Sequence, residues 1–202
     1  MAELASDDFT RADDTNLGAN WDDNTAVAAD GFSIVSNAVA PTSIFSDASE
    51  TNNSVTWPND QYSEVTFDAT AANGVGAGCG PTCREATAAN TMYRAAGNAS
   101  GYELGRIVAG TFTSLSTGAG TTFASTDRLK LQTVTNGANC DWTLFKNDVS
   151  FASGTDTSPI ASGRAGIVYS STDAGTTIAS WRGGDVAAAG GSSLLKKMRR
   201  YF

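Results

Sequence analysis

Glu64 and Asp68 have the residue types and the spacing needed to hydrolyse a glycosidic bond. In an extended strand, residues four positions apart project from the same face, so both carboxyl groups would point into one groove. Paired carboxyl groups are the catalytic residues of most glycoside hydrolases. The chain contains no histidine, which removes Ser-His-Asp and Cys-His triads and the commonest general base. A polysaccharide hydrolase is therefore the enzymatic hypothesis that these residues allow.

Six aspartates near the start of the chain have the oxygen ligands that Ca²⁺ takes in proteins. They are Asp7, Asp8, Asp13, Asp14, Asp22 and Asp23. Their spacing is not that of an EF-hand, and aspartates are also common in solvated turns that hold no ion. Turn formation is the favoured interpretation, so we predict no metal and no cofactor, with calcium as the alternative.

The three cysteines, Cys79, Cys83 and Cys140, cannot form a complete disulfide framework because their number is odd. Without histidine they also fall short of the four nitrogen or sulfur ligands of a structural zinc site. A bridge between Cys79 and Cys83 and three free thiols are both open. Free thiols are favoured for a chain made in a reducing cytoplasm.

Trp57 and Tyr62 are the candidate carbohydrate-binding residues, because exposed aromatic rings stack on sugar faces. Trp57 precedes Pro58 in the polar stretch 47–60, which we expect to be a surface loop. Tyr62 stands where the next strand is expected to begin. The alternative is that both rings belong to the core, as aromatic residues in the strands of a sandwich usually do.

The formal net charge of −8 argues against nucleic acid as a partner, because phosphates repel an acidic protein. No apolar run reaches the roughly 18 residues needed to cross a bilayer, so a membrane is not expected either. The segment after Met1 has neither the basic nor the apolar stretch of a secretory leader. We therefore expect a soluble protein that is made in a cytoplasm.

Apolar and polar residues alternate in short runs that end at Gly, Asn, Asp, Ser or Thr, a pattern typical of an all-β sandwich. The clearest run, 128–134, turns Leu129 and Leu131 inward and Lys130 toward water. The turn Asn136-Gly137 then leads to a second strand, which predicts a hairpin. Other strands are expected at 32–39, 62–69, 75–79, 92–95, 102–108, 112–115, 165–170 and 177–182.

The beginning of the chain carries a pattern that resembles the opening of concanavalin A-like lectin/glucanase domains, which are found in bacterial and bacteriophage proteins. Its residues are Asp8, Phe9, Arg11, Asp13, Leu17, Gly18 and Trp21. The resemblance implies that residues 1–186 form a concanavalin A-like jelly-roll β-sandwich. Enzymes of this class typically carry Glu-x-Asp-x-x-Glu along one strand, which the segment from Glu64 to Asp68 does not match. We therefore predict that the chain is not an enzyme.

The residues of this opening motif also have a structural interpretation. Phe9, Leu17 and Trp21 supply apolar side chains that can anchor the first strand in the core. Arg11 stands between Asp8 and Asp13, and we expect it to neutralise these acids at the end of the strand. Fold stabilisation is thus the predicted role of the motif.

The end of the chain, 187–202, combines a Gly-rich linker with a basic amphipathic tail. The tail consists of Leu194, Leu195, Lys196, Lys197, Met198, Arg199, Arg200, Tyr201 and Phe202. Its apolar and cationic side chains are suited to an acid-lined apolar groove on a neighbouring subunit. We expect this tail to be the partner-binding segment.

Such C-terminal tails, joined to this opening motif, resemble those of small bacteriophage structural proteins. The resemblance implies a virion component, and the leading hypothesis is a capsid decoration or cement protein. Its partners would be the major capsid protein and other virion subunits, with self-association, for example as a trimer. The alternative is a carbohydrate-binding adhesin or tail-fibre module that recognises a glycan of the host.

Overall fold

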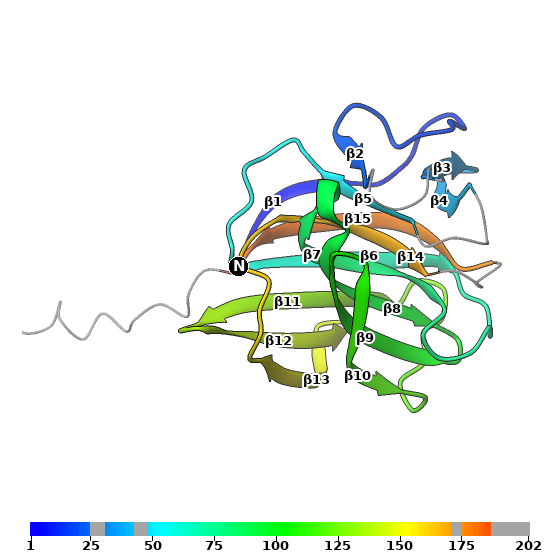
Figure 1. Ribbon diagram of the computed structural model, residues 1–202. Helices are drawn as coiled ribbons and strands as arrows, with labels where there is room; N and C mark the ends of the chain where they lie inside the picture. Colours follow the sequence, from blue (N-terminus) through cyan, green and yellow to red (C-terminus); the bar gives the residue numbers. More distant parts are fainter. Residues whose placement is uncertain (25–30, 43–47, 171–174, 187–202) are drawn as a thin grey trace, which may run out of the picture.

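The computed structural model describes residues 1–24, 31–42, 48–170 and 175–186, which form two antiparallel sheets packed face to face (Figure 1). This architecture confirms the predicted jelly-roll β-sandwich. The tail segment 187–202 lies outside the described residues. No helix among the described residues is long and apolar enough to cross a membrane, and the one helical element of those residues is the short 3₁₀ turn Thr87–Ala89.

Sheet A has eight strands. In spatial order they are β13 (Val149–Asp156), β12 (Asn139–Lys146), β11 (Arg128–Asn136), β6 (Gln61–Ala69), β15 (Thr177–Asp185), β4 (Ala38–Pro41) and β3 (Phe32–Val35), while β1 (Ala2–Asp7) also pairs with β15. Sheet B has seven strands. Their order is β10 (Thr111–Gly118), β9 (Gly101–Val108), β8 (Thr91–Asn98), β7 (Gly78–Ala86), β14 (Arg164–Ser170), β5 (Ala48–Asn52) and β2 (Trp21–Asp23).

The core lies between the sheets and is built by alternate residues of each strand. Val65 and Phe67 of β6 and Leu129 and Leu131 of β11 face inward from sheet A and are fully buried. Tyr93, Ala95, Leu104 and Ile167 complete this set from sheet B. Because successive side chains of a strand point to opposite faces, the residues between them must lie on the outer faces of the sandwich.

The opening motif packs as its apolar residues predict. Phe9, Leu17 and Trp21 are buried in the core, and Trp21 packs edge-on against Trp181 with ring centroids 4.8 Å apart. The predicted partners of Arg11 are wrong, however. Its guanidinium binds Asp7 through both nitrogens, at 2.7 and 3.1 Å, and donates to the Leu17 carbonyl at 2.7 Å.

Three predicted elements differ from the structure for identifiable backbone reasons. The strand expected at 32–39 is a hairpin, because Ser36 and Asn37 adopt positive φ between β3 and β4. The strand expected at 75–79 begins only at Gly78, after positive-φ turns at Gly74 and Gly76. The loop expected at 47–60 contains β5, a buried strand held between β14 and β2.

The cysteines are free thiols, as favoured by the sequence. Cys79, Cys83 and Cys140 are all buried. Burial raises the pKa of the Cys83 and Cys140 thiols, so neither is prone to ionise at neutral pH.

Candidate functional site

The outer face of sheet A carries a row of polar side chains that crosses four strands. Lys130 of β11 lies opposite Glu64 of β6, Glu64 lies opposite Arg182 of β15, and Arg182 lies opposite Ser6 of β1. These residues come from distant parts of the chain and meet only because the four strands are neighbours. The row therefore depends on the strand order of the sheet.

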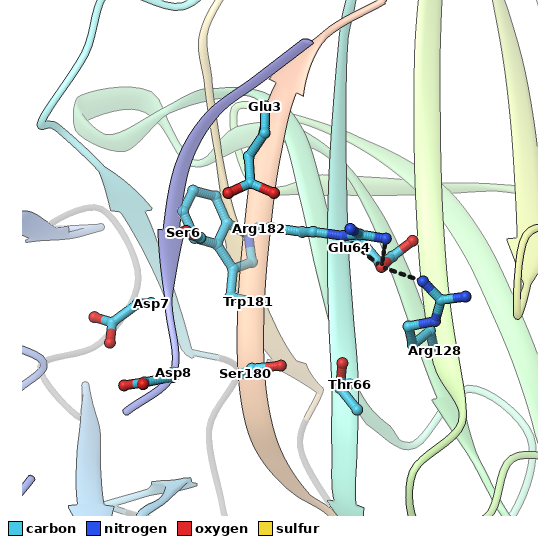
Figure 2. Close-up of a pocket in the computed structure, with 10 residues that line it drawn as sticks. All are labelled: Glu3, Ser6, Asp7, Asp8, Glu64, Thr66, Arg128, Ser180, Trp181 and Arg182. Atoms are coloured by element: carbon cyan, nitrogen blue, oxygen red, sulfur yellow. Dashed lines mark hydrogen bonds and ion pairs between the residues drawn. The ribbon is translucent and has the colours of Figure 1, made fainter. Parts of the chain in front are cut away.

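The same face is hollowed beside this row, with a volume of about 580 Å³ (Figure 2). The small side chains of Thr66 and Ser180, opposite each other on β6 and β15, lie between longer ones. The full lining is Glu3, Ser6, Asp7, Asp8, Glu64, Thr66, Arg128, Ser180, Trp181 and Arg182. Figure 2 shows Asp7 and Asp8 on one side, Arg128 on the other, and Glu3 nearer the middle. The depression follows from short side chains flanked by long ones.

Glu64 is buried and pairs with three cations, Arg128, Lys130 and Arg182, which lie on the basic side of the hollow. Its Oε1 accepts from Nε of Arg182 at 2.7 Å and from Nη1 of Arg128 at 3.4 Å. Lys130 Nζ lies 3.6 Å from its Oε2. Both Lys130 and Arg128 also pair with Asp148, and Lys130 Nζ lies 2.8 Å from Asp148 Oδ1. Glu64 and Asp148 thus offset two of the three positive charges on this side.

The acidic side of the hollow belongs to β1 and the residue that follows it. Burial alone would raise the pKa of Asp7, but hydrogen bonds from Arg11, Trp21 and the Phe9 amide outweigh it and lower that pKa. Asp8 accepts a hydrogen bond from the Thr10 amide at 3.0 Å. Within the described residues, neither Asp8 nor Glu3 forms an ion pair. No cation of the described part of the chain therefore neutralises their charges.

The pair predicted for hydrolysis, Glu64 and Asp68, lies on β6, but the two carboxyl groups have different partners. Glu64 is engaged by three cations, as described above. Asp68 is exposed and accepts a hydrogen bond from Thr177 Oγ1 at 2.9 Å. A glycosidase needs one carboxyl group free to donate a proton and another free to act as nucleophile or base. With Glu64 committed to ion pairs, the arrangement favours binding over hydrolysis.

Neither of the two candidate aromatic residues belongs to the lining of the hollow. The exposure expected for Trp57 is wrong, since the ring is partly buried and packs against Trp181 with centroids 5.9 Å apart, while Nε1 donates to the Asn52 carbonyl at 2.7 Å. Tyr62 is buried on the outer face, two residues before Glu64, and its ring covers Gly184. A sugar contact of either residue stays a prediction.

The aspartates considered for calcium are accounted for by protein donors or turns. Asp13 accepts from the Ser36 amide at 2.8 Å, and Asp14 accepts from the Asn16 amide at 3.2 Å. Asp22 pairs with Arg164 and accepts from Asn53 Nδ2 at 2.6 Å. In the part of the chain that the structure describes, no group of three or more Asp, Glu, Cys or His side chains is arranged to hold a metal ion.

Several residues of the hollow were not singled out from the sequence. They are Glu3, Ser6, Thr66, Arg128, Ser180 and Arg182. The alternation of the predicted strand at 62–69 does place Thr66 on an outward position, whereas a register shift between Ile178 and Ser180 breaks the alternation on the strand that carries Arg182. That signal gives the face of each strand, but it does not show which strands are adjacent.

Comparisons with known proteins identify the fold. No family model matches the chain, and no curated protein matches its sequence. A carbohydrate-binding module, CBM66 from Bacillus subtilis, superposes with a TM-score of 0.58 at 16% identity, covering 81% of this chain and 93% of that one. The exoplasmic/lumenal domain of VIP36, in a form bound to Ca²⁺ and Man3GlcNAc, gives a TM-score of 0.50 at 12% identity, covering 84% and 85%. The chain thus has a lectin-like β-sandwich fold.

Proposed function

We propose that the chain is a non-catalytic carbohydrate-binding module and that the hollow on the outer face of sheet A holds the sugar. The observation that carries this proposal is the polar lining of a depression of about 580 Å³, which lies within the size range of small-ligand sites. Two of the proteins that share the fold are described by their names as carbohydrate-binding or glycan-bound, which supports the same reading.

The lining suits a ligand rich in hydroxyl groups. Ser6, Thr66 and Ser180 present hydroxyls that form no hydrogen bond with the described residues, and each hydroxyl both donates and accepts. The carboxylates of Glu3 and Asp8 can accept from sugar hydroxyls, and the outer nitrogens of the arginines can donate. Because the described lining has four carboxylate side chains and two arginines, its charge is negative, and the proposed ligand is a neutral sugar rather than an acidic one.

Filling the floor of the hollow tests this function. We expect Ser180→Trp to reduce saccharide affinity about tenfold or more, because the indole would occupy the space between β6 and β1 without changing the charge. The sugar would first be found with a glycan array, and affinity then measured by calorimetry. Thr143→Trp is the matched control, since Thr143 lies on β12 of the same sheet and outside the lining.

The two variants separate the proposed site from the rest of the sheet. Equal binding by Ser180→Trp and Thr143→Trp would exclude the hollow as the sugar site. Cleavage of a polysaccharide by the wild-type chain, abolished by Glu64→Gln or Asp68→Asn, would instead establish the hydrolase hypothesis.

A virion role is a separate proposal that rests on the sequence of the tail. The chain would attach to the major capsid protein through residues 194–202, or serve as an adhesin that presents the hollow to host glycans from the surface of the particle. The tail lies outside the described residues, so its composition alone supports this reading: four cations and five apolar or aromatic side chains next to an acidic domain.

Deletion of residues 194–202 should leave the sandwich folded and weaken binding to virus particles, because the fifteen strands and the core residues that the structure describes all lie within residues 1–186. Co-sedimentation with purified particles measures this, and circular dichroism checks the fold. Unchanged occupancy on the particles after deletion would remove the tail as the attachment segment.

A further inference from the structure

Strand β10 is a free edge of sheet B. Among the described residues it pairs with β9 and with no other strand, so one row of its backbone N–H and C=O groups has no strand partner. Residues 111–114 are exposed. Such an edge is a template for another strand unless charges, proline or irregular geometry protect it.

The composition of β10 provides little of this protection. Thr111–Gly118 contains no charged residue and no proline, and it has three threonines and Phe112, which favour extended structure. The surrounding segment 107–126 is the longest stretch of the sequence without Asp, Glu, Lys or Arg, in a chain of which 17% is charged. One irregularity is present, a register shift between Ser114 and Ser116, which limits regular pairing to the first half of the strand.

Other edges of the described sandwich are short or carry charge. At the far end of sheet B, β2 spans three residues, of which Asp22 and Asp23 are acidic. In sheet A, β1 carries Glu3 and Asp7. The edge strand β13 ends at Asp156 and directly follows the exposed Asp148. Strand β10 therefore combines length with a neutral edge.

We propose that two copies of this chain associate through β10, in antiparallel pairing about a two-fold axis near Thr113. A second copy is the occupant that the charges favour, because two chains of net charge −8 repel each other least where both surfaces are uncharged. An antiparallel edge is complementary to itself under two-fold symmetry. Val108 and Phe112, which are 46% and 38% exposed, lie beside this edge and gain apolar contact in the pair.

A single lysine at the axis tests the pairing. Sedimentation velocity of the full chain over a range of concentrations should show a reversible dimer of the 20.8 kDa subunit. Thr113→Lys should raise the dimer dissociation constant about tenfold or more, because each lysine faces its copy across the axis and like charges in a cross-strand pair repel. Ser150→Lys on β13 is the matched control, since Ser150 is also exposed on an edge strand; it should leave the dissociation constant unchanged.

A cross-linking measurement makes the test independent of the lysine variant. Thr113→Cys should form a disulfide-linked dimer on mild oxidation and Ser150→Cys should not, while the native thiols are all buried. A wild-type chain that stays monomeric at every concentration would overturn the proposal. So would dissociation by Ser150→Lys with no effect of Thr113→Lys. Neither outcome depends on sugar binding, so the dimer and the proposed function can fail separately.

Discussion

Replacing Glu64 with glutamine is expected to lower the free energy of unfolding by about 3 kcal/mol, the usual cost of removing one partner from a buried ion pair. The Glu64 side chain is 2% exposed and faces Arg128, Lys130 and Arg182. A glutamine keeps the shape and one oxygen but leaves three cations close together without their central anion. Urea unfolding at neutral pH, compared with wild type, gives the change directly.

Asp148→Asn is the matched control for this loss of charge. Asp148 pairs with Arg128 and Lys130 as well, but its side chain is 54% exposed. Exposed ion pairs contribute little, so this variant should cost less than about 1 kcal/mol. Equal effects of the two substitutions would show that Glu64 does not organise the cations. Since Glu64→Gln destabilises the sheet, loss of sugar binding in that variant would not identify Glu64 as a ligand contact, and Ser180→Trp remains the cleaner test.

The face of each strand could be predicted from the sequence, because the alternation of side chains is local. Leu129 and Leu131 are inward as expected, and Lys130 is on the outer face. Lys130 is nevertheless 5% exposed rather than open to water. It is covered because Glu64 and Phe145, which lie opposite it on the flanking strands, pack around its side chain.

The candidate site could not be predicted in the same way, since it depends on which strands are adjacent. Glu64 and Arg182 are separated by 118 positions in the sequence and come into contact only because β6 pairs with β15. Nothing in either segment alone specifies that pairing. Trp57 illustrates the reverse error: its polar neighbours and Pro58 indicate a loop, but the loop folds back so that the indole packs against Trp181.

The pairing of β2 with β5 brings a buried glutamate next to an exposed aspartate, and this has a consequence for stability. Asp23 lies opposite Glu50, which is 2% exposed. Burial, together with the neighbouring carboxyl groups of Asp23 and Glu85, raises the pKa of Glu50 to about 8 although a hydrogen bond from the Phe32 amide opposes the shift. Glu50 is therefore protonated in the folded chain at neutral pH and shares a hydrogen bond with Asp23.

This raised pKa predicts that the protein loses stability as the pH rises from about 4.5 to about 8. Below the lower value, Glu50 is protonated in both the folded and the unfolded chain. Between the two values the unfolded chain releases this proton while the folded chain keeps it, which favours unfolding. One pKa unit corresponds to about 1.4 kcal/mol, so the loss from this group reaches several kcal/mol at pH 8.

Glu50→Gln should remove that loss, because glutamine does not titrate and can make the same contacts. Its Oε1 can accept from the Phe32 amide, as Glu50 Oε1 does at 2.8 Å, and its Nε2 can donate to Asp23 as the protonated carboxyl group does. Thermal unfolding should give equal midpoints for variant and wild type near pH 4.5 and a higher midpoint for the variant at pH 8. Glu3→Gln, at an exposed residue, controls for the change in net charge. If the variant were no more stable than wild type at pH 8, Glu50 would have to be ionised in the folded chain. Its burial beside Asp23 would then need a counter-charge that the described residues do not provide.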